Sequence, residues 1–252
     1  MKGTEPGALS PLGNAPRPPA DAPRSLADAP HRLADATDAL ARTAVRYRAC
    51  QRFTRHYVAS KLRRDPIHHA VLSLAADHPF GRVADIGCGR GQVGLALLEA
   101  GGAVAVTGLD WAGRSLDDAR RAGAGLVFTA QAQDLAACPA IPDCDTALLI
   151  DVLYLLRQDQ AVRLLGLAAA AARRRLVVRT LDVDRGLRSK FHLAMEHLGR
   201  PFWPHAGAVV DPAPLPVLAA VMEAAGFTVT REPCWQGTPF ANVLMTAWKT
   251  GG

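Results

Sequence analysis

The chain has 252 residues, a formal net charge of +6 and 49% hydrophobic residues. These values exclude an intrinsically disordered chain and are typical of one folded domain with additions. No apolar run reaches the roughly 20 residues that a membrane helix needs, and the first residues lack the apolar core of a signal peptide. The five cysteines form no CxxC pair, which argues against a disulfide framework and a zinc site. We therefore expect a cytoplasmic protein with reduced thiols.

The N-terminal third is predicted to hold a disordered arm and a helical cap. Residues 1–32 are rich in Pro, Ala, Gly and Asp and predict disorder. Apolar residues then recur at helical spacing from Leu33 to Leu62, and a second helix is expected over residues 66–76. We assign residues 33–81 to a helical N-terminal cap that could cover a ligand of the domain behind it.

The same cap carries a cluster of basic residues. Eight Arg and Lys residues and no acidic residue lie between Asp38 and Asp65. Such a face attracts an acidic partner, which could be a nucleic acid, a phosphate-bearing substrate or an acidic protein. A solvated helix face explains it equally well.

The first strand is predicted at residues 83–86, and a glycine-rich turn follows it. Glycines there let the backbone come close to a ligand, and the next helix begins with unpaired amide groups. Gly89 to Gly94 fit the GxGxxG pattern of a dinucleotide site, a weak signal alone. Asp85 argues against that cofactor, because its carboxylate would repel a pyrophosphate but attract the ammonium and sulfonium groups of S-adenosylmethionine.

The rest of the chain alternates between strands and helices. Further strands are expected at residues 103–111, 126–130, 145–150, 176–180, 227–230 and 241–248, and helices at residues 115–121, 158–173 and 214–225. The last two strands are joined by a short link and should pair antiparallel. The predicted fold class is α/β: an open, mostly parallel seven-stranded sheet with helices on both faces and a closing antiparallel strand. This domain would span residues 82–252, with an insert at 181–213 that holds a helix over 187–198.

The turn that begins at Asp85 resembles the D/E-x-G-x-G-x-G motif of class I, Rossmann-like S-adenosylmethionine-dependent methyltransferases, and the resemblance extends over residues 82–249. It implies that the first acid supports the methionine end of the cofactor. It also implies that an acid ending the second strand holds the ribose hydroxyls and that the residue after this acid packs on adenine. An Asp after the third strand, with a Leu beside it, would contact the adenine amino group, and the exit of the fourth strand would line the sulfonium and the substrate. The cofactor-binding residues implied are Asp85, Gly87, Cys88, Gly89, Gly91, Asp110, Trp111, Asp134, Leu135 and Asp151.

Methyl transfer from a sulfonium needs a nucleophile in near-attack geometry and, for a phenol, an amine or a carbon acid, a group that removes a proton. Candidates for this base or for substrate orientation are Asp151, Tyr154, Arg179, His192, His197 and His205. No HxxxH pair occurs among the histidines, so no metal is expected.

The acceptor is expected to be a small molecule that is methylated on oxygen or carbon. The segment from Asp151 to Tyr154 lacks the prolines found in enzymes that methylate nucleic-acid amino groups, and no cysteine nucleophile lies there. The flanks at residues 61–66 and 238–242 resemble bacterial enzymes of polyketide-type and aryl-polyene pigment pathways. This implies an aromatic or carrier-bound biosynthetic intermediate, with an acidic acyl carrier protein as partner. The alternatives are an RNA-directed methyltransferase that uses the basic cap and an NAD-dependent oxidoreductase.

Overall fold

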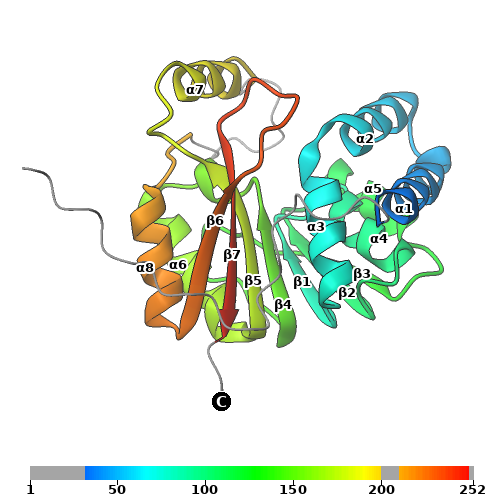
Figure 1. Ribbon diagram of the computed structural model, residues 1–252. Helices are drawn as coiled ribbons and strands as arrows, with labels where there is room; N and C mark the ends of the chain where they lie inside the picture. Colours follow the sequence, from blue (N-terminus) through cyan, green and yellow to red (C-terminus); the bar gives the residue numbers. More distant parts are fainter. Residues whose placement is uncertain (1–31, 200–209, 250–252) are drawn as a thin grey trace, which may run out of the picture.

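The computed structural model describes residues 32–199 and 210–249, which build one seven-stranded sheet between two layers of helices (Figure 1). The strands are β1 Arg82–Ile86, β2 Ala105–Asp110, β3 Phe128–Ala132, β4 Cys144–Ile150, β5 Ala172–Leu181, β6 Phe227–Pro233 and β7 Asn242–Lys249. Their order is β3-β2-β1-β4-β5-β7-β6. Strand β7 runs antiparallel to β5 and β6, and the other neighbours pair parallel. The predicted fold class is confirmed.

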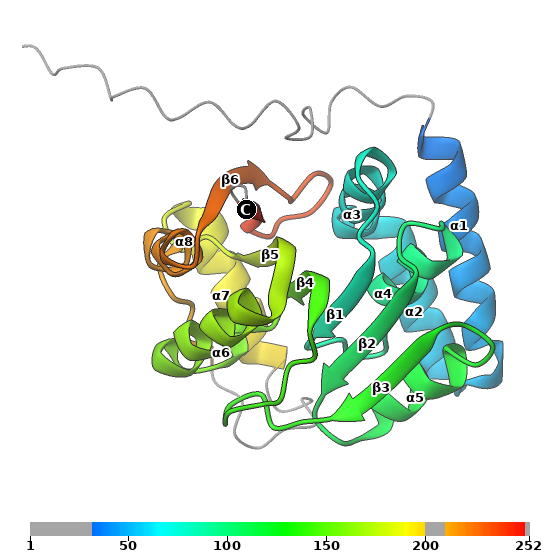
Figure 2. The same cartoon turned by 90° about the horizontal axis from the view of Figure 1, so that it is seen from below.

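Helices cover both faces of this sheet. They are α1 Arg32–Arg46, α2 Arg52–Arg64, α3 Pro66–Asp77, α4 Gln92–Glu99, α5 Arg114–Ala122, α6 Gln158–Ala171, α7 Leu187–Gly199 and α8 Leu215–Ala224, with short 3-10 turns η2 Tyr47–Ala49 and η3 Leu153–Leu155. Helices α1, α3 and α4 contact one another, and α6 contacts α8 on the opposite face (Figure 2). Alternate residues of the inner strands therefore enter two separate cores, as Leu148 and Leu149 of β4 do.

The prediction of a continuous helix from Leu33 to Leu62 is wrong, because the helix is interrupted between α1 and α2. Cys50 and Gln51 adopt extended backbone angles there. The break changes which face is buried: Phe53 belongs to the predicted apolar stripe but is 71% exposed, whereas Thr54 is buried. The Thr54 hydroxyl donates a hydrogen bond to the Asp118 carboxylate of α5 at 2.8 Å. A contact distant in sequence thus overrides the helical periodicity.

Two strand boundaries also differ from the prediction. Strand β3 begins at Phe128, which leaves Val127 outside it and exposed. Strand β5 begins at Ala172, so Arg173, expected at the end of the preceding helix, and the two arginines after it belong to the sheet. Arg175 is buried between the rings of Phe80 and Trp248, with its guanidinium carbon 4.5 and 3.8 Å from their centroids. Stacking on two aromatic rings allows this cation inside a strand.

The predicted arm lies outside the described residues apart from Arg32, and residues 200–209 of the expected insert lie outside them as well. Within the described part of the chain, no helix combines the length and the apolar character needed to cross a lipid bilayer.

Candidate active site

The glycine-rich turn between β1 and α4 has a backbone that side chains would distort. Gly87, Gly89 and Gly91 have φ values of 77°, 54° and 76°, a region that L-residues rarely adopt. A Cβ on Gly87 would lie 2.6 Å from the Cβ of Val152, while one on Gly89 would meet nothing within 4 Å. The turn is therefore close-packed against the segment after β4 on one side and open to a cavity on the other.

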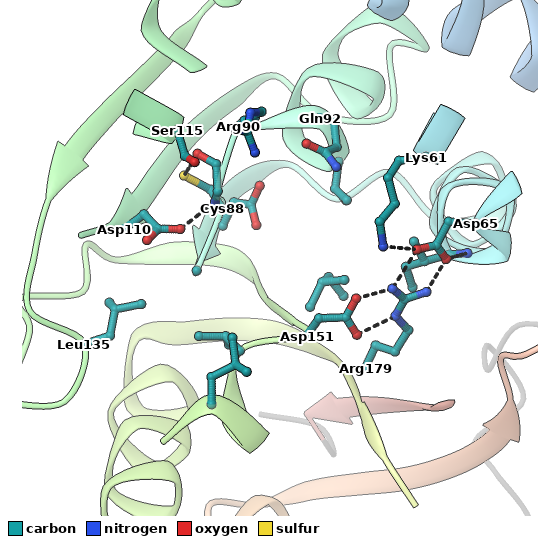
Figure 3. A pocket seen from close by; sticks show the side chains of 18 of the residues that line it. Lys61, Asp65, Cys88, Arg90, Gln92, Asp110, Ser115, Leu135, Asp151 and Arg179 are labelled. Atoms are coloured by element: carbon teal, nitrogen blue, oxygen red, sulfur yellow. Dashed lines mark hydrogen bonds and ion pairs between the residues drawn. The ribbon is translucent and has the colours of Figure 1, made fainter. Parts of the chain in front are cut away.

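Asp110, at the end of β2, fixes this turn in place. Its carboxylate accepts hydrogen bonds from the backbone N–H groups of Gly89 at 2.6 Å and of Trp111 at 2.7 Å. Figure 3 shows Asp110 beside Cys88 at the edge of the cavity. Two neighbouring strand ends thus share one carboxylate at the carboxyl edge of the sheet, where open α/β sheets bind ligands.

Asp85 lies buried at the end of β1, beneath the turn. Burial and the nearby charge of Asp110 raise the pKa of its carboxyl to about 7, although a hydrogen bond from the backbone of Gly94 acts in the opposite direction. Its Oδ2 atom has no hydrogen-bond partner among the described residues. A buried acid of this kind gains stabilisation when a cation is placed beside it.

A cavity of about 300 Å³ follows this edge of the sheet. Eight of the ten predicted cofactor-binding residues line it: Asp85, Gly87, Cys88, Gly89, Asp110, Trp111, Leu135 and Asp151. Gly91 does not line it but forms the N-cap of α4. Asp134 does not line it either; it is exposed and its carboxylate accepts a hydrogen bond from the N–H of Ala136 at 2.9 Å.

The cavity also has walls that the sequence interpretation did not assign. They come mainly from α2, from the start of α3 and from the start of α4, and include Tyr57, Lys61, Asp65, His68, Arg90 and Gln92. The cap was expected to cover a ligand, but none of its residues was named. The Asp-Pro pair at residues 65 and 66 does carry a local signal, since Asp is a preferred N-cap and Pro suits the first helical turn.

Asp65 joins the cap to the sheet edge through the buried guanidinium of Arg179. Arg179 Nη2 donates to Asp65 Oδ2 at 2.9 Å, and Nε donates to Asp151 Oδ1 at 2.8 Å, with a second short contact to each carboxylate (Figure 3). Lys61 Nζ lies 3.3 Å from Asp65. We call these four residues the Arg179 cluster.

The charges of the Arg179 cluster stabilise one another. Burial alone would lower the pKa of Arg179, but the two carboxylates hold it well above its usual value. For Asp65, burial alone would raise the pKa. The hydrogen bonds and the charge of Arg179 outweigh that effect and keep the pKa of Asp65 well below its usual range. Asp151 is held with φ 58°, the one positive value for a non-glycine residue among the described residues. Asp151 and Arg179, both predicted as catalytic candidates, thus neutralise each other.

A second cavity, of about 510 Å³, adjoins the first, and the Arg179 cluster and Tyr57 border both. Its remaining walls come from α2, η3, α7, the link between β6 and β7 and the start of β7: Phe53, His56, Ser60, Arg64, Tyr154, His192, Glu196, Thr238, Phe240 and Asn242. Tyr154 and His192 are therefore brought together, as two of the predicted catalytic candidates. The side chain of His197 and all of His205 lie outside the described residues.

Residues 83–175 match the family model of a methyltransferase domain. The matched segment contains the glycine-rich turn, Asp110 and Asp151, and so most of the residues that line the first cavity. Residues 83–175 thus resemble a methyltransferase domain, and the sheet around them has the Rossmann-like fold of class I methyltransferases. Methyltransferases of this class are S-adenosylmethionine-dependent, and the open face at Gly89 and the unpartnered oxygen of Asp85 fit that cofactor. The dinucleotide interpretation is accordingly not favoured.

Solved structures share this fold at low sequence identity. Magnesium protoporphyrin IX methyltransferase from Synechocystis PCC 6803, crystallised with SAH, has a TM-score of 0.57 and 20% identity over 87% of this chain and 98% of its own. An O-methyltransferase family protein from Burkholderia thailandensis has a TM-score of 0.56 and 18% identity, over 88% of this chain and 71% of its own. The pyocyanin biosynthetic protein PhzM has a TM-score of 0.58 and 21% identity, over 81% of this chain and 60% of its own. A comparison with curated protein sequences gives no match.

The Arg179 cluster generates a stability prediction. Replacing Arg179 by Met should lower the free energy of unfolding by about 3–5 kcal/mol, because two partly buried carboxylates lose their buried cation. Urea denaturation at pH 7 measures this. The difference from wild type should shrink below about pH 4, since Asp65 contributes stability only while its carboxylate stays ionised and this contribution is lost as the pH falls.

Arg231→Met, on the exposed part of β6, is the matched control and should change stability by no more than about 0.5 kcal/mol. An Arg179→Met variant as stable as this control would show that the cluster does not hold the cap on the sheet.

Proposed function

We propose that the protein transfers a methyl group from S-adenosylmethionine to oxygen or carbon of a small-molecule acceptor bound in the second cavity. The observation that carries this proposal is the size and position of that cavity. It has about 510 Å³, a volume usual for small-molecule sites, and it meets the first cavity at Asp151 and Arg179. We refer to the two as the donor cavity and the acceptor cavity.

The proposed donor site follows from the contacts at the sheet edge. The open backbone at Gly89 would receive the methionine part, with its ammonium near Asp85. Asp110 would hold the ribose hydroxyls, and the apolar surfaces of Trp111 and Leu135 would hold adenine. Gly91 and Asp134 would act less directly, through the start of α4 and through the turn that places Leu135.

The acceptor is proposed to be small because its cavity has a volume of about 510 Å³, and aromatic side chains form part of the cavity wall. Phe53 and Tyr57 stack with ring centroids 6.2 Å apart, and Phe240 lies 4.8 Å from the ring of His192. Two structural neighbours point in the same direction, since their names state a porphyrin substrate and a role in pyocyanin biosynthesis.

Neither an acyl carrier protein nor RNA is part of the proposal. Three of the eight basic side chains that suggested an acidic partner are engaged inside the protein. Arg42 and Arg46 both contact Glu99 of α4, and Lys61 contacts Asp65. We interpret the other five basic side chains as part of a solvated surface.

The donor cavity should bind S-adenosylmethionine and its demethylated product, and Asp110→Ala should weaken both by about 100-fold. The variant loses the carboxylate and frees the N–H groups of Gly89 and Trp111, and hydrogen bonds to charged groups contribute about 1.5–3 kcal/mol each. Calorimetry measures the affinities, with Asp159→Ala on the exposed start of α6 as control. Tighter binding of NAD than of S-adenosylmethionine would contradict the assignment.

The affinity for S-adenosylmethionine should depend on pH through Asp85. Its pKa is raised to about 7, so the carboxylate that attracts the cofactor is mostly neutral at pH 6 and mostly ionised at pH 8. The dissociation constant should then fall by about 10-fold between these two pH values. Asp85→Asn should bind more weakly and lose this dependence. An unchanged pH profile in the variant would remove Asp85 from the site.

The acceptor itself can be found with labelled cofactor. Extracts of the source organism incubated with the protein and methyl-labelled S-adenosylmethionine should yield a labelled compound of low molecular mass, identified by mass spectrometry, and Asp110→Ala should not produce it. Label recovered only in RNA or protein would contradict a small-molecule acceptor, and label in no fraction would contradict methyl transfer as the function.

A further inference from the structure

Glu196 occupies an unusual place among the carboxylates of the acceptor cavity. It projects from α7, which stands with the β6–β7 link on one side of the opening, while α2 stands on the other (Figure 1). The other two carboxylates of this cavity, Asp65 and Asp151, are bound to Arg179. The side chain of Glu196 is 23% exposed, and its described contacts are to a histidine and a tyrosine.

His192 contacts Glu196 as a hydrogen-bond donor. Its Nδ1 atom accepts a hydrogen bond from the N–H of Ala241 at 3.3 Å, so this nitrogen carries a lone pair. The hydrogen of the neutral ring is thereby assigned to Nε2, which lies 3.3 Å from Glu196 Oε1. Neither nitrogen of His192 is then available to take a proton from an acceptor.

Tyr154 contacts the same oxygen. Its hydroxyl lies 3.4 Å from Glu196 Oε1, and burial together with the charges of Asp151 and Glu196 raises its pKa well above the usual value. The phenol therefore keeps its proton and donates. Two donors on Oε1 orient the carboxylate and leave Oε2 with its lone pairs for a further partner.

The turn η3 connects this group to the methyl donor. Val152 and Leu155 line the donor cavity, while Tyr154, between them in sequence, lines the acceptor cavity. One short turn therefore borders the cofactor site and also contacts Glu196 through Tyr154. Phe53, Tyr57 and Phe240 add aromatic walls on which a ring can stack.

We propose that the acceptor is an aromatic compound with a hydroxyl group and that Glu196 is the general base that removes its proton. The proposal rests on the methyltransferase function proposed above. As the acceptor oxygen forms its bond to the methyl carbon, the carbon–sulfur bond breaks and its electron pair stays on sulfur, which becomes a neutral thioether. The hydroxyl proton moves to the Glu196 carboxylate and later to solvent. An acceptor that is already an anion needs no such base.

The test compares Glu196→Gln and Glu196→Asp with wild type, using the acceptor isolated from the extract in which wild type forms a labelled product. Glu196→Gln should lower kcat by about 10²–10⁴-fold, the usual contribution of a general base, with no more than a threefold change in S-adenosylmethionine affinity. Glu196→Asp keeps the carboxylate and should recover part of kcat. The product should carry its label on an aromatic oxygen.

Glu223→Gln, on the exposed face of α8, is the matched control and should retain wild-type kcat. A kcat of Glu196→Gln within threefold of wild type overturns the proposal, and so does a loss of kcat in His56→Gln alone, since His56 lines the same cavity. If Glu196→Gln unfolds, the kcat of Glu196→Asp decides, and a value as low as background overturns it. Label on a carboxylate oxygen contradicts the role of Glu196 only. Label on nitrogen also contradicts the oxygen or carbon acceptor proposed above, and no product with wild type contradicts the proposed function altogether.

Discussion

The ion pairs of Arg179 are the interaction on which the rest of the site depends. They connect three segments that are distant in sequence: the junction of α2 and α3, the end of β4 and the end of β5. A buried cation that satisfies two carboxylates cannot be rearranged cheaply. Both cavities meet at this cluster, so the same contacts that hold the helical cap against the sheet also fix the boundary between methyl donor and methyl acceptor.

Acidic side chains at the sheet edge differ in charge state because their surroundings differ. Asp85 is buried without a cation and has a raised pKa, while Asp65 is buried beside Arg179 and has a lowered one. The first would gain an ionic partner when a cationic cofactor binds, and the second already has one. Similar residues a short distance apart therefore serve different purposes, one toward ligand binding and one toward architecture.

The sequence predicts the parts of the molecule that depend on local patterns. The order and type of most strands and helices follow from periodicity, and the glycines, Asp85 and Asp110 identify the donor cavity because their spacing is local. The break at Cys50, the buried Arg175 and the pairing of Asp65 with Arg179 depend on contacts between distant segments. Glu196 was not singled out for the same reason: its partners Tyr154 and His192 were both named, but only the fold shows that they converge on it.

The two cavities are built from different segments of the chain. The donor cavity is built mainly from residues 83–175, whereas most walls of the acceptor cavity come from α2, α7 and the β6–β7 link, which flank that segment on either side. Replacing these flanking pieces would alter the acceptor while the machinery that activates the methyl group stays intact. The segments that select the acceptor would then be separate from the segment that binds the methyl donor. Related enzymes with different flanking segments would differ in the acceptor that they methylate.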